Sequence, residues 1–392
     1  MDISMFLEPV SEKCFTETFR PGKNTFGETL TIYKDEEDFP DLAGFQLALV
    51  GVKEERGAVD NHGCADGADH IRKAFYKLFN HWVDLKIVDL GNIKAGKEIS
   101  DTYYALNQVL TELLKEHVLP IVIGGSQDMT YTMYQVYEPT GKLINITTID
   151  PIFDLGNDNE RLNSHSYLSH IILHQPNYLF NFTNIGYQSY YVDNESVDLM
   201  KQLLFDTYRL GILKQHIELT EPLIRNANIV SFDMGAIRAA DAPGVKNASP
   251  NGFNGDDACQ MTRYAGLNFK LSSIGFFEYN PHYDINSRTA NLIAEMIWYF
   301  IEGFSSRQDD IPTAETADDF KRYNVQIGDG EENVVFLCHK ITGKWWIDMS
   351  FMHADDPRYE RHHYIPCSVE DYDQAMRNEL PDKWWQFYQK LM

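Results

Sequence analysis

The segment Pro120-Ile121-Val122-Ile123-Gly124-Gly125-Ser126-Gln127-Asp128 places a short apolar run directly before a glycine pair. An apolar run of this kind is typical of a parallel strand that is buried on both faces. A glycine pair after a strand is typical of a tight turn. Two similar junctions follow: Ile149-Asp150-Pro151-Ile152-Phe153-Asp154 and Ser231-Phe232-Asp233-Met234-Gly235. All three lie at the carboxyl ends of predicted strands, where open α/β sheets place their ligand sites.

Strand-like and helix-like stretches alternate from about residue 44 to 304. The predicted strands cover residues 45–52, 86–90, 120–124, 143–150, 179–186, 228–234 and 272–278. The predicted amphipathic helices cover residues 65–79, 101–116, 256–267 and 285–304. This alternation predicts a mostly parallel sheet that is covered by helices.

The alternating region defines the predicted domain organisation. Residues 1–43 are expected to form an N-terminal extension, 44–304 the α/β domain, 305–332 a linker, and 333–392 a small C-terminal α+β extension with a hairpin and helices. The extension ends in an aromatic cluster of Trp384, Trp385, Phe387 and Tyr388. Docking onto the chain's own domain is the favoured interpretation of this cluster, and an interface with a partner is the alternative.

Composition excludes several classes of protein. The chain has 392 residues and a formal net charge of −24, which disfavours nucleic acid or anionic lipid as a partner because phosphate binding needs clustered Lys and Arg. The sequence contains no apolar run of membrane-spanning length. The five cysteines are scattered without a C-x-x-C pair, so we expect reduced thiols in a cytoplasmic protein.

Taken together, the three junctions resemble the metal-binding motifs of the ureohydrolase superfamily, which includes arginase, agmatinase and formimidoylglutamase. The pattern of that family is G-G-x-H-S, D-A-H-x-D and S-x-D-x-D, and this chain is most similar to the formimidoylglutamase-like members. The resemblance implies a three-layer α/β/α fold with a sheet of about eight strands. It also implies a homo-oligomer that hydrolyses C–N bonds of linear amidines with two Mn²⁺ ions and a bridging hydroxide.

The resemblance also implies which residues stand at the metal-ligand positions. The first ion would be bound by Gln127, Asp150, Asp154 and Asp233. The second ion would share Asp150 and Asp233, but its other two ligand positions hold Ile152 and Gly235, which offer no side-chain donor. We therefore expect no metal, or one weakly bound divalent ion (Mn²⁺, Mg²⁺ or Ca²⁺).

Other residues near the motifs match further features of the family. Glu278, followed by Tyr-Asn-Pro, matches the glutamate that accepts the substrate guanidinium, and Ala242-Pro243-Gly244 matches the end of the substrate loop. His165 stands where the family has an active-site histidine, although an incidental histidine beside a helix-capping Ser164 is the simpler interpretation. Arg238 is a candidate cation that could replace the metal between the aspartates; a surface arginine is the equal alternative.

Three functions from different classes agree with these features. The first is a catalytically inactive or impaired member of the superfamily that acts as a binding or structural protein, with a small guanidino or formimidoyl compound as its candidate ligand. The second is an active hydrolase of linear amidines that uses a single metal ion. The third is an assembly protein whose C-terminal extension binds a partner. Three histidines in the C-terminal extension are expected to be solvated rather than to bind metal: His353, His362 and His363.

Overall fold

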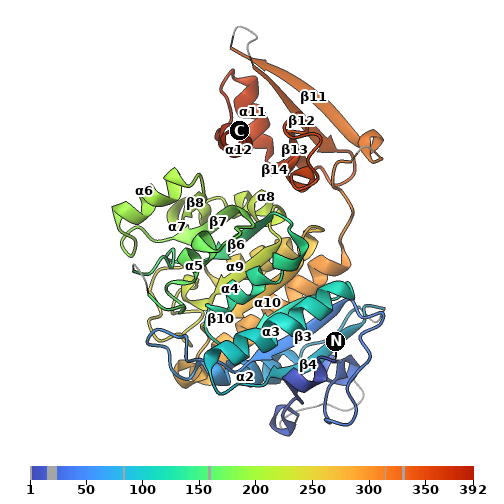
Figure 1. The fold of residues 1–392 in the computed structure, drawn as a ribbon, viewed down its shortest axis with the longest axis vertical. Helices are drawn as coiled ribbons and strands as arrows, with labels where there is room; N and C mark the ends of the chain where they lie inside the picture. Colours follow the sequence, from blue (N-terminus) through green and yellow to red (C-terminus); the bar gives the residue numbers. More distant parts are fainter. Residues whose placement is uncertain (1, 16–23, 83, 158–159, 314, 329–331) are drawn as a thin grey trace.

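The computed structural model describes residues 2–392 apart from 16–23, 83, 158–159, 314 and 329–331. Parts of the predicted N-terminal extension and linker therefore lie outside the described residues. The main body is a three-layer α/β/α sandwich around a ten-stranded sheet, and a four-stranded antiparallel sheet forms a second, smaller part (Figure 1). The predicted fold class is confirmed.

The large sheet has the strand order β1-β4-β3-β5-β10-β9-β6-β7-β8, with β2 paired to β4. Only β1 is antiparallel to its neighbour. The strands are β1 (Leu7–Glu8), β2 (Thr31–Ile32), β3 (Leu47–Val52), β4 (Ile87–Ile93), β5 (Leu119–Ile123), β6 (Ile144–Ile149), β7 (Leu179–Tyr187), β8 (Asp206–Arg209), β9 (Ile229–Asp233) and β10 (Ser273–Phe277). Each of the seven predicted strands corresponds to one of these. The sheet is larger than expected because β1 and β2 come from the N-terminal extension and β8 is a short edge strand.

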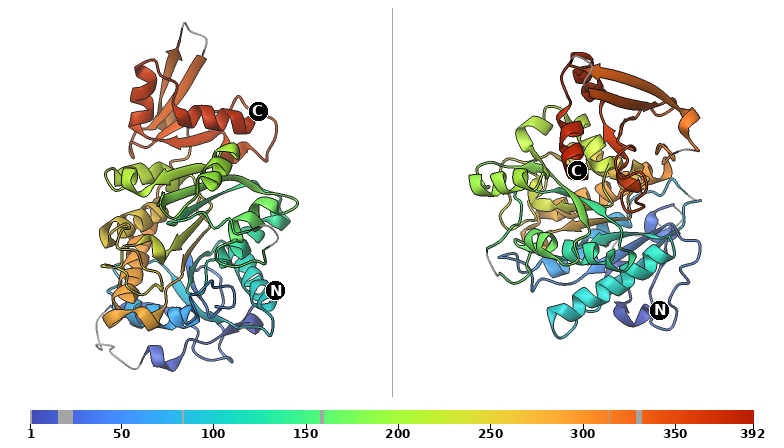
Figure 2. Two further views of the ribbon diagram at one scale, coloured as in Figure 1. Left: turned by 90° about the vertical axis from the view of Figure 1, so that its left-hand side faces the viewer. Right: turned by 45° about the horizontal axis from the view of Figure 1, so that its top comes forward.

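Helices cover both faces of this sheet (Figure 2). One core lies between the sheet and α2, α8, α9 and α10, and the other between the sheet and α3 to α6. The helices of the main body are α1 (Phe26–Thr29), α2 (Gly67–Phe75), α3 (Ile99–Lys115), α4 (Met129–Gln135), α5 (Tyr167–Leu173), α6 (Asn194–Gln202), α7 (Leu210–Leu213), α8 (Thr220–Arg225), α9 (Gly255–Leu267) and α10 (Arg288–Ser305). Because both faces are covered, β3, β5 and β6 are buried along their whole length, as their apolar sequences predict.

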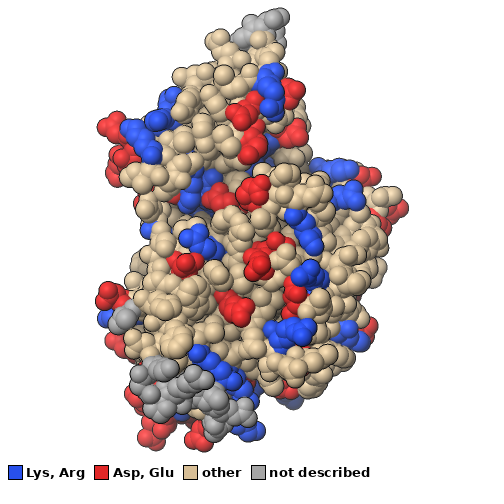
Figure 3. Space-filling model, turned by 180° about the vertical axis from the view of Figure 1, so that it is seen from behind, with Lys and Arg blue, Asp and Glu red and all other residues tan. Residues whose placement is uncertain are grey.

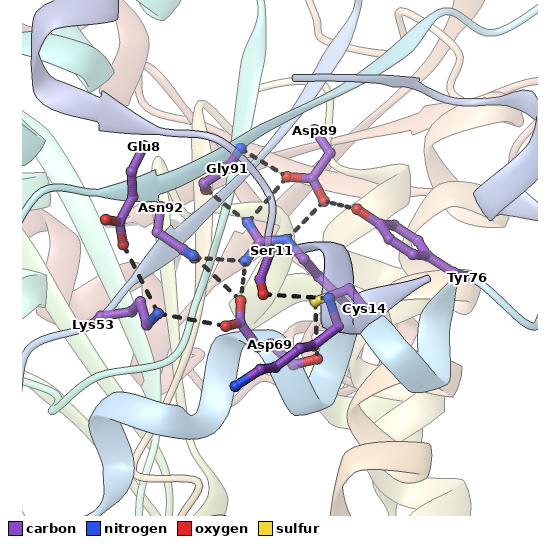
Figure 4. A network of polar contacts seen from close by, with 11 residues as sticks. Glu8, Ser11, Cys14, Lys53, Asp69, Tyr76, Asp89, Gly91 and Asn92 are labelled. Atoms are coloured by element: carbon purple, nitrogen blue, oxygen red, sulfur yellow. Dashed lines mark hydrogen bonds and ion pairs between the residues drawn. The ribbon is translucent and has the colours of Figure 1, made fainter. Parts of the chain in front are cut away.

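A buried polar network fixes α2 to the sheet edge where the N-terminal extension joins (Figure 4). The Arg72 guanidinium is fully buried and donates from Nε to Asp89 Oδ2 over 2.8 Å and from Nη2 to the Gly91 carbonyl over 2.7 Å. Tyr76 donates its hydroxyl proton to the same Asp89 carboxylate over 2.7 Å. A buried arginine is tolerated only when its donors are satisfied. These hydrogen bonds therefore fix the position of α2 relative to β4.

The smaller sheet has the order β11-β12-β13-β14, and two helices pack against it. Its elements are β11 (Phe320–Ile327), β12 (Glu332–His339), β13 (Trp345–Asp348), β14 (Tyr364–Cys367), α11 (Val369–Met376) and α12 (Asp382–Leu391). The range 305–332, expected to be a linker, therefore contains β11. This strand is buried on one face only, and its many polar residues made the sequence look like a linker. Trp384 and Phe387 are buried within this part, whereas Trp385 is 47% exposed.

The C-terminal part docks against the amino ends of the central strands. Lys270, just before β10, donates from Nζ to the Arg361 carbonyl over 3.0 Å, and Arg361 donates from Nη1 to the Asn226 carbonyl just before β9. His362 lies 3.3 Å from the Leu143 carbonyl just before β6, and its ring stacks on Phe180. The expectation of solvated histidines is wrong for His362 and His363, which this seam buries.

Among the described residues, no helix is both long and apolar enough to cross a lipid bilayer.

Candidate functional site

A cavity of about 380 Å³ opens at the carboxyl edge of the large sheet, on the opposite side from the C-terminal part. It lies where β5, β6, β9 and β10 end, since the residues that follow these strands form its wall. Six of the residues singled out from the sequence line it: Gln127, Ile152, His165, Asp233, Gly235 and Glu278. Asp150 and Asp154 are buried nearby. The structure thus brings the three sequence motifs together at one place.

Asp150 and Asp233 each use one carboxylate oxygen to accept a hydrogen bond from the backbone amide two residues ahead in the same turn. Asp150 Oδ1 accepts from the Ile152 amide over 2.8 Å, and Asp233 Oδ1 accepts from the Gly235 amide over 2.6 Å. The donors in these two turns belong to the residues at the lost ligand positions. A Cβ atom at position 235 would lie 3.1 Å from Asp233 Oδ1, so a side chain there would be directed at this carboxylate.

Several buried oxygens at the site have no hydrogen-bond partner of ordinary geometry among the described residues. They are Asp150 Oδ2, both carboxylate oxygens of Asp154, and the amide oxygen Gln127 Oε1. Asp154 also has a left-handed backbone with φ of +51°, which is uncommon for a residue other than glycine. A buried acceptor without a donor is costly, and strained residues persist where the surrounding structure holds them and concentrate at functional sites. The site is therefore arranged to face something that supplies positive charge or protons.

The ionisation of the carboxyl groups reflects this arrangement. Burial raises the pKa of Asp154 and Asp233 well above their ordinary values, and the negative charge of Asp150 raises both further. Burial raises the pKa of Asp150 as well. Burial likewise raises the pKa of Glu278 to about 7. Without a cation, these groups favour their neutral forms.

Glu278 is held rigidly at the end of β10. Its Oε1 accepts from the Gln127 backbone amide over 2.9 Å, and its Oε2 accepts from Asn61 Nδ2 over 2.7 Å. Its backbone is left-handed, with φ of +64°. Sequence reasoning singled out Glu278 but missed Asn61, because Asn61-His62-Gly63 stands in a loop outside the three motifs. The cavity wall also includes Lys246 and Tyr191, which no motif indicated.

Asn61 positions Glu278, and its removal should be measurable. We expect Asn61→Ala to lower the free energy of unfolding by about 2 kcal/mol, because it removes a buried hydrogen bond to a carboxyl group. Chemical denaturation of the two proteins measures the difference. Asn291→Ala, on the exposed face of α10, is the matched control and should change stability by less than about 0.5 kcal/mol. Equal stability of the Asn61→Ala variant and the parent would contradict this role.

Three sequence-based interpretations, for Arg238, Ser164 and His165, have a structural outcome. Arg238 does not replace a metal ion: its guanidinium pairs with Asp241, with Nε 2.9 Å from Oδ2, and this acid three residues ahead holds it in its own loop. Ser164 does not cap a helix, because its hydroxyl accepts from the Val59 amide and α5 begins at Tyr167. His165 is exposed at the cavity. Asp128, which follows Gln127, accepts from the Tyr103 hydroxyl and is fully buried.

The residues present do not fit a pair of manganese ions. Ile152 and Gly235 offer no donor atom, and Gln127 offers one neutral oxygen where imidazole would stand. In the part of the chain that the structure describes, no three His, Cys, Asp or Glu side chains are grouped so as to hold a metal ion. A two-ion site needs several charged or imidazole ligands to offset four positive charges, and this set of residues does not supply them.

The protein belongs to the class of three-layer α/β proteins that have a ligand site at the carboxyl edge of a parallel sheet. In this chain the site is a cavity lined by acidic side chains. The match to known families is more specific. A profile described as "Arginase family" matches residues 45–302. The chain belongs to the arginase family.

Similar proteins share the main body of this chain. It is 26% identical over 282 residues to a formimidoylglutamase of Staphylococcus haemolyticus, an alignment that covers 68% of this chain and 88% of the relative. A Staphylococcus aureus formimidoylglutamase is 24% identical over 271 residues, with 65% and 86% covered. The profile ends before the C-terminal part begins, so the smaller sheet lies outside the family match.

Solved structures with the same fold include two proteins of similar name. Trypanosoma cruzi formiminoglutamase, whose crystal structure is described as containing Mn²⁺, superposes with a TM-score of 0.63 at 19% identity, over 69% of this chain and all of that chain. Bacillus subtilis formimidoylglutamase superposes with a TM-score of 0.66 at 16% identity, over 74% of this chain and 96% of that chain. These similarities show the fold.

Proposed function

We propose that this arginase-family chain has lost the two-manganese reaction and uses its cavity to bind a small organic cation of the guanidine or amidine class. The observation that carries the proposal is the identity of residues 152 and 235. Isoleucine and glycine there remove two ligand side chains from a site that still holds three aspartates and Glu278. A cytoplasmic location and a homo-oligomeric state belong to the same proposal.

The chemistry of the cavity supports a cationic ligand. A planar guanidinium or amidinium offers several N–H donors, which match carboxylate oxygens in pairs. Glu278 and Asp233 line the cavity, and buried acceptors without donors lie close by. A cavity of about 380 Å³ suits a small metabolite. The names of the relatives point to the same class, because a formimidoyl group is an amidine.

The test combines metal analysis with ligand binding. Elemental mass spectrometry of protein prepared with added manganese and no chelator should find less than one ion per chain. Calorimetry in EDTA should then detect agmatine or guanidinium binding to the parent, and Glu278→Gln should weaken it at least about tenfold, because a charge-assisted hydrogen-bond pair is worth 1.4 kcal/mol or more. Two bound ions per chain, or no cation binding in EDTA, would refute the proposal.

A hydrolase that works with one metal ion is the second candidate. It is favoured by the four buried oxygens without donors at Gln127, Asp150 and Asp154, which are hard ligands of the kind that Mg²⁺, Mn²⁺ or Ca²⁺ accept. It predicts one ion per chain and release of urea or formamide from a guanidino or formimidoyl compound. In that case Asp154→Ala must abolish the release; release that persists would come from a contaminating enzyme.

A further inference from the structure

A second cavity lies in the seam between the main body and the C-terminal part. Its volume is about 540 Å³. Its ionisable lining residues are mainly basic: Lys142, Lys270, Arg358, Arg361 and His363 stand against the single acid Glu360. In a chain with a net charge of −24, such a gathering of cations needs a local explanation.

The half-buried cations Lys270 and Arg361 of this seam lack acidic partners. Arg225, on α8, differs from them because it has an acidic partner: its Nε lies 2.8 Å from Glu221 Oε1 in an ion pair. Among the described residues, no carboxylate forms an ion pair with Lys270 or Arg361. Lys270 donates to the Arg361 carbonyl and lies over the Trp346 ring, 5.1 Å from its centroid, and Arg361 donates to the Asn226 carbonyl. The Arg361 atom Nη2 is buried and has no acceptor within the part of the chain that the structure describes.

A third unpartnered group faces the same cavity. His363 is 9% exposed, lines the cavity, and has a buried Nε2 without a hydrogen-bond partner. Arg358 is excluded from this set, because it pairs with Asp356 over 2.7 Å. The basic side chains available to a ligand are therefore Lys142, Lys270, Arg361 and His363.

The lowered pKa values of Lys270 and Arg361 show that their charged forms are unfavourable in this seam. Burial lowers the pKa of Lys270 well below its ordinary value, and the charges of Arg361 and Arg225 lower it further. Burial lowers the pKa of Arg361 to about 10. Arginine nonetheless stays protonated at neutral pH, and a partly buried charge without an opposite charge nearby destabilises the folded chain. A bound anion would offset this cost.

We propose that this seam cavity binds a small organic oxyanion, a phosphate ester or a carboxylate, through Arg361, Lys270 and His363, with Lys142 at its rim. The guanidinium and ammonium groups supply charge-assisted hydrogen bonds to the oxyanion. Ile311, Pro312 and Tyr364 provide an apolar wall for the rest of the molecule. The ligand would bridge the two parts of the chain, because Lys142 and Lys270 belong to the main body and Arg361 and His363 to the C-terminal part.

Nothing in this proposal depends on the carboxyl-edge cavity. The two sites lie at opposite ends of the strands, since Lys142 and Lys270 precede β6 and β10 while Glu278 follows β10. On the face seen in Figure 3, Lys and Arg are interspersed with Asp and Glu. Where its residues are described, this face therefore has no extended basic surface that would suit a polyanion.

Calorimetric titration of the full chain in Bis-Tris chloride tests the proposal, with inorganic phosphate and succinate as the two probes. We expect saturable binding of at least one probe at one site per chain. Phosphate alone would identify a phosphate ester as the class of ligand, and succinate alone a carboxylate. Arg361→Gln and Lys142→Ala should each weaken the binding, the first at least about tenfold. The matched control is Lys115→Ala, at the exposed end of α3, which should leave the affinity within about twofold.

The outcomes decide the proposal in either case. If Arg361→Gln fails to fold, as judged by circular dichroism, Lys142→Ala on the rim and His363→Gln serve in its place. Absence of saturable binding of both probes at millimolar concentration overturns the proposal. Binding that Lys115→Ala weakens as much as the seam variants do indicates an adventitious ion only, and overturns it as well.

Discussion

The variant Gln127→His/Ile152→His/Gly235→Asp is expected to bind two Mn²⁺ ions per chain, where the parent binds fewer than one. The three substitutions restore the imidazole and carboxylate donors that the arginase-family pattern has at these positions. The scaffold for them is present, because Asp150, Asp154 and Asp233 remain and a Cβ at position 235 points at the Asp233 carboxylate. Elemental mass spectrometry after dialysis against manganese measures the change.

Two controls separate restored ligation from non-specific uptake. Adding Asp233→Asn to the triple variant removes a carboxylate shared by both ion positions, and we expect this to abolish most of the uptake. The contact of 3.1 Å at Gly235 predicts that the triple variant is less stable than the parent in EDTA and regains stability when manganese binds. If metal uptake matches that of the parent, the assignment of the ligand positions is wrong, and with it the proposed reason for lost catalysis.

The motifs could be located from sequence because strand ends are strongly marked in a doubly covered parallel sheet. Apolar runs such as residues 121–123 must be buried on both faces, and the polar residues directly after them then meet at one edge. That reasoning needs no knowledge of side-chain conformation. It therefore predicted the convergence of Gln127, Asp233 and Glu278, which come from segments more than 40 residues apart.

Other features depend on contacts that no local pattern encodes. Asn61 contacts Glu278 across 217 residues of sequence. The sequence left two interpretations of Arg238 open, and the structure agrees with the surface arginine, which pairs with Asp241. β8 is too short and too polar to be predicted as a strand. In β11, apolar and polar residues alternate within a segment rich in Asp and Thr, which is typical of a linker. The burial of His362 follows from docking of the C-terminal part onto the amino ends of the strands, which sequence periodicity cannot indicate.

Raising the pH from 5 to 8 in EDTA is expected to destabilise this protein through its buried carboxyl groups. Burial raises the pKa of Glu278 from its ordinary 4.5 to about 7 in the folded chain. A carboxyl group whose pKa is raised by folding binds its proton more tightly in the folded state. Its stabilising contribution is therefore complete below about pH 4.5 and is lost as the pH rises through about 7. At about 1.4 kcal/mol per pKa unit, the loss from Glu278 alone is about 3 kcal/mol, and Asp154 and Asp233 act in the same direction.

The variant Glu278→Gln isolates this contribution, because glutamine keeps the side-chain shape but cannot ionise. His362, whose pKa burial lowers well below its usual range, acts in the opposite direction at the acidic end, so the parent's curve alone is ambiguous. We therefore expect the difference in unfolding free energy, Glu278→Gln minus parent, to rise by about 3 kcal/mol between pH 5 and pH 8. Glu116→Gln, at the exposed end of α3, should show no such rise. A difference that stays constant with pH would mean that a cation of the protein already neutralises Glu278, and the cavity would then have no need of a cationic ligand.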